Sequence, residues 1–236
     1  MIVPGEWEPE AENWVRWARA PFHDAYWYYR DAFFDLILPV RRGRCIEIGC
    51  GEGRVARDLS ARGDRVTGVD TSMTLLRSAR QAGAAGAYVL ADSAALPFSG
   101  SRFDLAVAYN SLQVVADMPG TVAEAARVLV PGGHFCVVVS HPLADVGHFA
   151  DDSATAGYVI RDDYFASRRV DDTVERDGLT ITFRGWTYTL QDYAGALGQA
   201  GLTIDAMREP RPDGAPGRYD RWNRVPMFLM IRTTKG

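Results

Sequence analysis

Three glycines at alternate positions form the strongest chemical signal in this sequence. Gly49, Gly51 and Gly53 follow the apolar run Arg44–Ile48 and precede a helix-like segment, Val55–Arg62. Glycine lets the backbone turn tightly and approach a ligand, and a helix start offers free N–H groups above the strand end. The pattern predicts a site for a nucleoside cofactor. Because glycine-rich turns also occur without a ligand, the prediction depends on the residues that follow.

Two carboxylates follow at the ends of the next two apolar runs. Asp70 comes directly after Arg65–Val69, and Asp92 comes directly after Ala87–Ala91. A carboxylate at the end of a strand can accept hydrogen bonds from both ribose hydroxyls, which more than one class of nucleoside-cofactor enzyme uses. Asp92 is placed to accept from an adenine amino group, with the backbone N–H of Ser93 directed at the ring. The spacing therefore indicates a nucleoside site but leaves the class of enzyme open.

The elements that must position these residues alternate between short apolar runs and helix-like segments. Five such runs precede residue 141: Arg44–Ile48, Arg65–Val69, Ala87–Ala91, Phe103–Ala108 and Phe135–Ser140. This alternation predicts an α/β fold with a parallel sheet covered by helices.

An aromatic-rich segment precedes the first strand. From Glu6 to Pro39 the aromatic spacing is compatible with two amphipathic helices, and the residues are Trp7, Trp14, Trp17, Phe22, Tyr26, Trp27, Tyr28, Tyr29, Phe33 and Phe34. We expect this segment to form a helical lid.

The alternation breaks between His141 and Tyr188. Phe165–Val174 and Leu179–Trp186 flank an Asp-Gly pair, which predicts an inserted β-hairpin that caps the domain. A capping pattern, Thr189 to Asp192, then opens a helix that Gly201 ends. The runs Leu202–Met207 and Met227–Ile231 predict the final two strands.

Length and composition favour one domain. The 236 residues are 47% hydrophobic and 24% charged, and no internal repeat or second core is evident. Residues 1–236 are therefore expected to form a single domain. Its expected parts are a helical lid at 1–40, a cofactor-binding core at 43–140, a cap insertion at 141–188, and a helix with two strands at 189–236.

Charge and cysteine content restrict the partners. The formal net charge of -4 opposes nucleic acid or an anionic membrane as the main partner and favours a small molecule. The start is acidic and lacks a leader-like apolar run, so we expect a cytoplasmic protein. Cys45, Cys50 and Cys136 lie in or beside apolar runs and are expected to be reduced core thiols. No His or Cys spacing suggests a metal site.

Five segments together resemble the successive motifs of class I S-adenosylmethionine-dependent methyltransferases. They are Glu47–Gly53, Asp70, Ala91–Ser93, Phe103–Leu112 and Arg127–Gly133, within residues 43–140. The resemblance implies a Rossmann-like, mostly parallel seven-stranded sheet whose last strand is antiparallel. It also implies that S-adenosylmethionine binds with its methionine part along the glycine loop, above Glu47, and that Asp70 holds the ribose and Asp92 the adenine amino group. The expected cofactor-binding residues are Glu47, Gly49, Cys50, Gly51, Gly53, Asp70, Thr71, Asp92, Ser93, Asn110 and Tyr29.

Two other classes of protein remain as alternatives. A dehydrogenase directs its third glycine at a pyrophosphate, whereas this loop is one residue tighter and has Glu47 and Glu52 nearby, which suit an ammonium. A non-catalytic protein that binds or senses S-adenosylmethionine would carry the same motifs.

The acceptor is expected to be small, and an aromatic or secondary-metabolite molecule methylated on N or O fits the aromatic lid. Tyr109–Leu112 lacks the Asn/Asp-Pro-Pro-Tyr pattern, which argues against adenine or glutamine as acceptor. Holding donor and acceptor together can supply about 7–11 kcal/mol of the barrier. Tyr26, Tyr29 and Trp186 could line the site and stabilise positive charge by about 0.5–2 kcal/mol each, although aromatic residues at helical spacing are more often core.

His141, directly after the fifth predicted strand, is the first candidate for a general base. It could instead cap the strand, and an amine acceptor would need it only for positioning. His23 is the second candidate base. The candidate catalytic residues are His141, His23 and Tyr26, and the candidate substrate-binding residues are Tyr26, Trp186 and His141. Whether the protein is a monomer or a homo-oligomer is left open.

Overall fold

The centre of the protein is a seven-stranded sheet with strand order β10-β11-β5-β4-β1-β2-β3. The computed structural model describes residues 7–83, 86–214 and 217–236. The strands are β1 Arg44–Ile48, β2 Arg65–Asp70, β3 Gly86–Leu90, β4 Phe103–Tyr109, β5 Leu129–Ser140, β10 Leu202–Arg208 and β11 Phe228–Lys235. Strands β1 to β5 pair in parallel, and β11 runs antiparallel to both of its neighbours, β5 and β10. The expected fold class, with its antiparallel last strand, is confirmed.

The observed strands contain the predicted runs with small shifts at the ends. The largest shift is in β5, which begins at Leu129 and not at Phe135. Leu129 already pairs with Phe103, and an irregularity in register follows before His134 pairs with Leu105. The Pro131–Gly133 stretch therefore lies inside a strand as a bulge.

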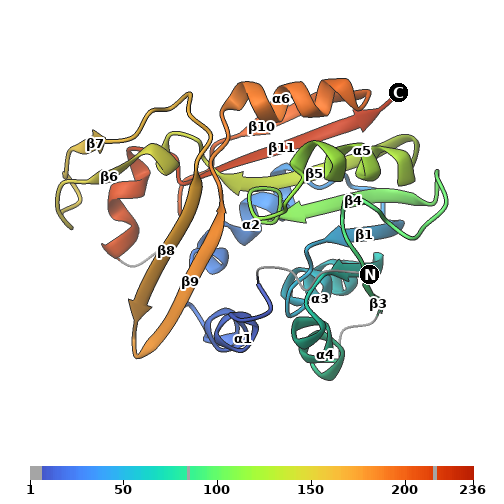
Figure 1. Cartoon of the computed structure of the whole chain (residues 1–236), viewed down its shortest axis with the longest axis horizontal. Helices are drawn as coiled ribbons and strands as arrows, with labels where there is room; N and C mark the ends of the chain where they lie inside the picture. The colour runs from blue at the N-terminus through green and yellow to red at the C-terminus, as the bar shows by residue number, and fades with distance from the viewer. Residues whose placement is uncertain (1–6, 84–85, 215–216) are drawn as a thin grey trace.

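Helices cover both faces of the sheet, as alternating side chains in the strands require. On one face lie α2 (Tyr26–Leu36), α3 (Arg54–Arg62) and α4 (Met73–Gln81), which share a core with Cys45, Leu105, Val107 and Cys136. On the other face lie α5 (Met118–Val128) and α6 (Leu190–Gln199), which share a core with the neighbouring strand residues Ile46, Ala106 and Val137. In Figure 1 α6 lies along β10 and β11 at the top of the view, and α3 and α4 lie near β1 and β3 lower in the view.

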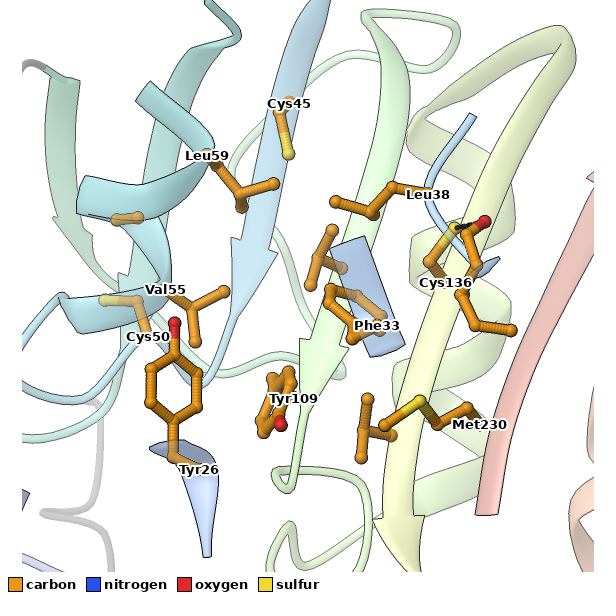
Figure 2. Packing of buried hydrophobic residues seen from close by; sticks show 14 of the residues in the cluster. Tyr26, Phe33, Leu38, Cys45, Cys50, Val55, Leu59, Tyr109, Cys136 and Met230 are labelled. Atoms are coloured by element: carbon orange, nitrogen blue, oxygen red, sulfur yellow. Dashed lines mark hydrogen bonds between the residues drawn. The ribbon is translucent and has the colours of Figure 1, made fainter. Parts of the chain in front are cut away.

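The face covered by α2 and α3 is rich in aromatic rings and thiols. Figure 2 shows Phe33 packed beside Tyr109 at the end of β4, with their ring centroids 5.2 Å apart. Cys45, Cys50 and Cys136 are all buried and free. Burial raises the pKa of each thiol, so the three remain protonated and unreactive.

A cap of non-contiguous segments lies at the carboxyl ends of the parallel strands. It includes α1 (Ala11–Arg19), the hairpin of β8 (Arg169–Arg176) and β9 (Leu179–Trp186), and the 3-10 helix η2 (Gly217–Asn223). In Figure 1 the arrowheads of β4 and β5 point toward the side where this hairpin lies, with α1 beside it. A shorter pair, β6 (Gly147–Phe149) and β7 (Tyr158–Ile160), follows the 3-10 helix η1 (Ala144–Val146) and was not predicted.

Local signals account for two features near the cap. Asp177 and Gly178 have φ of 50° and 77° and form the predicted hairpin turn, although β8 begins later than Phe165. At the start of α6, Thr189 and Asp192 form the reciprocal capping box that their spacing predicts. Within the described ranges, none of the helices combines the length and apolar character needed to cross a bilayer.

Candidate functional site

The glycine loop after β1 is tied to the end of β2. The backbone N–H groups of Gly49 and Cys50 both donate to the carbonyl oxygen of Val69, at 2.8 and 2.9 Å. Gly49 has a φ of +69°, and a Cβ at this position would lie 2.5 Å from the Cβ of Ser111. Only glycine allows this approach, so the loop, β2 and the segment after β4 meet at one edge of the sheet.

Asp70 holds the same loop through its side chain. Its Oδ2 accepts the N–H of Gly51 at 2.8 Å, and its Oδ1 accepts the N–H of Ser72 at 2.9 Å. Burial raises the pKa of Asp70, while these bonds and the N–H of Thr71 oppose the rise. The carboxylate stands at the strand end where the ribose is expected, beside Thr71.

Two acceptor oxygens near the loop are buried and lack hydrogen-bond partners within the described ranges. They are Oε2 of Glu47, whose residue is 2% exposed, and Oδ1 of Asn110. Glu47 lies in β1, and Asn110 follows the adjacent β4. Burial, with Asp70 and Glu52 nearby, raises the pKa of Glu47 well above its usual range. Unpaired buried acceptors are costly, so the site fits a ligand that brings N–H donors, such as an ammonium.

Glu52 plays a different part from the one expected. Its carboxylate is 1% exposed and pairs with Arg57 at 2.7 Å and with Arg19 of α1 at 2.9 Å. These two arginines neutralise Glu52, so Glu52 would not repel a pyrophosphate as expected. Through these two ion pairs Glu52 instead links α1 to α3.

Helix α1 covers the glycine loop. The Nε1 atom of Trp14 would lie 3.1 Å from a Cβ at Gly51. Ahead of the helix, Glu8 accepts hydrogen bonds from the hydroxyls of Ser72 and Thr74, at the start of α4. The predicted lid therefore contacts the loop and α4 directly.

An ion pair between Arg54 and Asp24, not predicted from the sequence, lies beside the glycine loop. Arg54 directly follows Gly53, and its Nη1 lies 2.7 Å from Oδ2 of Asp24, with both side chains mostly buried. The guanidinium also lies 4.2 Å from the ring centroid of Tyr26 and 5.1 Å from that of Trp14. An arginine directly after the third glycine was a visible signal, but its partner comes from a distant turn.

The predicted adenine-side residues lie after β3. Asp92 is exposed and accepts the N–H of Ala94 at 2.9 Å. The hydroxyl of Ser93 is buried against that of Thr121 at 2.8 Å. Cys50 is buried, and its Sγ would lie 2.8 Å from a Cβ at Gly68, so its thiol packs against β2.

Both ring nitrogens of His141 are engaged. Nδ1 accepts the backbone N–H of Leu143 at 3.0 Å, so a neutral ring carries its proton on Nε2, which lies 2.9 Å from Oε1 of Glu209. Burial lowers the pKa of His141. No lone pair is free to take a proton from an acceptor in this arrangement, which favours positioning over base catalysis.

His23 is the better placed of the two candidate bases. Its side chain is 4% exposed, and its Nδ1 lies 3.4 Å from Oδ2 of Asp177 in the hairpin turn. Its Nε2 is buried and has no partner in the described ranges. Burial and the charge of Arg176 lower the pKa of His23, so the ring is neutral at pH 7 and has a lone pair to use.

The three aromatic residues predicted to line the acceptor site differ in their surroundings. The Tyr26 hydroxyl donates to Asp58 at 2.5 Å, and burial raises its pKa, so it cannot serve as a base. Tyr29 is fully buried with its ring 4.9 Å from that of Phe228, which places it in the core. Trp186 is half-buried, and its backbone N–H donates to Gln113 in the loop after β4.

Asp145 is a titratable group that the sequence did not reveal. It lies in η1, four residues after His141, and is partly buried. Burial raises its pKa to about 7, and Arg168 opposes the rise. A carboxyl group that titrates near neutrality can exchange protons at physiological pH. Among the described residues, no cluster of His, Cys, Asp or Glu is arranged to hold a metal ion.

Residues 46–137 match the family model described as a methyltransferase domain. The chain is 31% identical over 182 residues to the malonyl-[acyl-carrier protein] O-methyltransferase of Erwinia pyrifoliae, covering 75% of this chain and 68% of that protein. It is 37% identical over 103 residues to the Salmonella typhimurium protein of the same name, covering 44% of this chain and 41% of that one. The ubiquinone biosynthesis O-methyltransferase of Methylobacterium nodulans is 39% identical over 103 residues, covering 42% of this chain and 41% of that protein.

The alignments with several of these curated relatives span only about two fifths of the relatives' length. Among solved structures, an S-adenosylmethionine dependent methyltransferase from Mesorhizobium loti superposes with a TM-score of 0.72 at 25% identity, covering 90% of this chain and 98% of that one. The similarity therefore extends beyond the glycine loop to most of the fold.

The raised pKa of Asp145 predicts a pH-dependent effect on stability. The folded state binds this proton more tightly than the unfolded state, whose pKa is near 3.8, so the group's favourable contribution is lost as pH rises from 4 toward 7. We expect Asp145→Asn to exceed the wild type in free energy of unfolding by about 1–3 kcal/mol at pH 8 and to equal it near pH 4, measured by urea denaturation. The exposed control Asp172→Asn should show no such difference. An equal offset for Asp145→Asn at both pH values would contradict the assignment.

Proposed function

The chain belongs to the class I S-adenosylmethionine-dependent methyltransferases, and we propose that it methylates an oxygen of a small acceptor, with a carboxylate as the preferred group. Its similarity to proteins named as O-methyltransferases supports oxygen over nitrogen. The choice of a carboxylate rests on His141, because both of its ring nitrogens are engaged and it has no free lone pair to act as a base.

The residues around the glycine loop suit S-adenosylmethionine, which supplies an electrophilic methyl group on a sulfonium when it is bound. The oxygens of Glu47 and Asn110 that have no partner among the described residues can accept from its ammonium, and Arg54 lies beside the same loop. Asp70 would accept from the ribose hydroxyls and Asp92 from the adenine amino group. In this proposal the chain binds and orients the reactants, and positioning lowers most of the barrier.

A carboxylate needs no base because it is already ionised at neutral pH. His141 stands at the carboxyl end of β5, yet the N–H of Leu143 occupies its Nδ1 and Glu209 faces its Nε2. We therefore assign His141 a positioning role. It would hold Glu209 and the chain after β5 in place while the acceptor binds.

A phenol is the second candidate acceptor, and one observation favours it. The Nε2 atom of His23 is buried and has no hydrogen-bond partner among the described residues, and a neutral histidine of this kind can take the proton of a hydroxyl group. One relative is named for ubiquinone biosynthesis, which supports keeping this class. Phenols form one part of the wider class first expected, aromatic or secondary-metabolite acceptors methylated on N or O.

The acceptor class can be tested by release of S-adenosylhomocysteine. We expect turnover with the malonyl thioester of N-acetylcysteamine to exceed turnover with substituted phenols and aromatic amines. Turnover with amines alone would contradict the oxygen assignment. Binding of S-adenosylmethionine without turnover on any acceptor would favour a non-catalytic binding or sensor protein.

Two histidine variants separate the carboxylate from the phenol. His23→Gln should lower kcat about 10²-fold or more on a phenol and less than about threefold on a carboxylate, since only the phenol needs a base. His141→Gln serves as the comparison and should affect both acceptors alike. A selective loss on phenols in His141→Gln, with His23→Gln unaffected, would reverse the two assignments.

The role proposed for Asp70 predicts a loss of cofactor affinity. Asp70→Ala removes the acceptor for Gly51 and Ser72 as well as for the ribose, so binding of S-adenosylmethionine should weaken by about 1–3 kcal/mol in calorimetry. Asp35→Ala changes the same charge on an exposed part of α2 and should leave affinity unaltered. Equal affinity in Asp70→Ala and the wild type would remove Asp70 from the site.

A further inference from the structure

Two arginines from separate segments of the cap converge on one backbone oxygen. Nη1 of Arg176, at the end of β8, donates to the carbonyl oxygen of His23 at 3.0 Å. Nη2 of Arg218, in η2, donates to the same oxygen at 3.2 Å and to that of Phe22 at 3.1 Å. Since both nitrogens lie within hydrogen-bond distance of one atom, two positive charges are held close together.

In the part of the chain that the structure describes, neither Arg176 nor Arg218 forms a salt bridge, although Asp177, next to Arg176, lies 3.4 Å from Nδ1 of His23. Other arginines do form salt bridges, for example Arg221 with Asp152 at 2.5 Å and Arg168 with Asp162 at 2.7 Å. Two like charges at this separation repel each other, and a bound anion would remove the repulsion. The chain has more acidic than basic residues, so a surplus of arginine does not explain the pairing.

The two guanidinium groups are held by aromatic rings. Arg176 is partly buried and lies 5.4 Å from the ring centroid of Trp17, while the more exposed Arg218 lies 5.4 Å from that of Tyr219. Stacking of this kind limits the conformations of a long side chain, and a guanidinium presents its donors in a planar fork that matches carboxylate and phosphate oxygens. The pair is therefore preorganised for an oxyanion.

The turn that both arginines contact has two further features of a binding site. His23 has a buried Nε2 without a partner in the described ranges. Phe22 has a φ of +57°, a conformation that is costly for an aromatic residue, and its side chain is 62% exposed. An acceptor with an apolar portion beside its anionic group would match this surface.

The pair also lies close to the cofactor loop. Asp24, the next residue after His23, pairs with Arg54, which directly follows Gly53. In Figure 1 the tip of the β8–β9 hairpin, where Arg176 ends β8, lies beside α1. We propose that Arg176 and Arg218 bind an anionic group, a carboxylate or a phosphate, of the methyl acceptor. This inference rests on the proposed methylation of a small acceptor.

Direct binding of simple anions tests the pair without turnover. Calorimetry of the intact protein with malonate and with inorganic phosphate should show binding that weakens at least ~10-fold in Arg176→Gln and in Arg218→Gln. Arg221→Gln removes the same charge from the same 3-10 helix, at a residue paired with Asp152, and should bind like the wild type. Thermal melting of each variant checks that it is folded. Because Arg218 is more exposed than Arg176, we expect Arg218→Gln to disturb the fold less than Arg176→Gln. Tighter binding of malonate identifies a carboxylate site, and tighter binding of phosphate a phosphate site.

Kinetics separate this inference from the proposed function. Two substrates are compared: the malonyl thioester of N-acetylcysteamine, which has a carboxylate but no phosphate, and malonyl-coenzyme A, which has both a carboxylate and phosphates. With either substrate, Arg176→Gln and Arg218→Gln should raise KM about 10-fold with little change in kcat. Unchanged KM for both thioesters and unchanged anion binding in these variants would overturn the arginine site while leaving methyl transfer intact. Absence of anion binding in the wild type, or an equal loss in Arg221→Gln, would also overturn it. If the anions bind as expected but no acceptor is turned over, the arginine pair remains an anion site. The proposed methyl transfer would then be refuted, together with the inference that the anion belongs to the methyl acceptor.

Discussion

The arrangement of the site depends on one carboxylate that joins two segments. Asp70 accepts one N–H from the glycine loop after β1 and another from the start of α4, so it fixes the loop relative to the helix. Parallel pairing of β1 with β2 brings the ends of the two strands together and makes this bridge possible. The same edge buries Glu47, whose Oε2 has no hydrogen-bond partner in the described ranges, a cost that a bound ligand can offset.

The cap is attached to this framework by charged groups. Glu8 contacts the first turn of α4, and Glu52 joins Arg19 of α1 to Arg57 of α3. Aromatic contacts then connect α1 to the hairpin, since the ring of Phe183 lies 5.9 Å from that of Trp17. The residues that would meet an acceptor thus come from the N-terminal helices, the hairpin and η2, all held against a loop near the middle of the chain.

The sequence predicted the features that arise from local patterns. The glycine loop, Asp70 at the end of β2 and the Thr189–Asp192 capping box each depend on residues that are neighbours in the chain or recur with a fixed period. The ion pair of Arg54 with Asp24 could not be predicted in this way because it joins residues 30 positions apart. The same limit applies to the convergence of Arg176 and Arg218 on one carbonyl oxygen. The state of His141 depends on a backbone N–H two residues away, whose direction follows from the fold and not from residue type.

The central claim, methyl transfer to a carboxylate oxygen, is tested most directly by the chemical nature of the product. The enzyme would be supplied with S-adenosylmethionine carrying a deuterated methyl group and with a malonyl thioester, and the product would be examined by mass spectrometry before and after mild alkali. We expect one deuterated methyl group per acceptor, which alkali releases as methanol because it is held in an ester. A labelled product that releases no methanol in alkali, as expected of methylation at the carbon between the two carbonyl groups of the malonyl thioester, would contradict methyl transfer to oxygen.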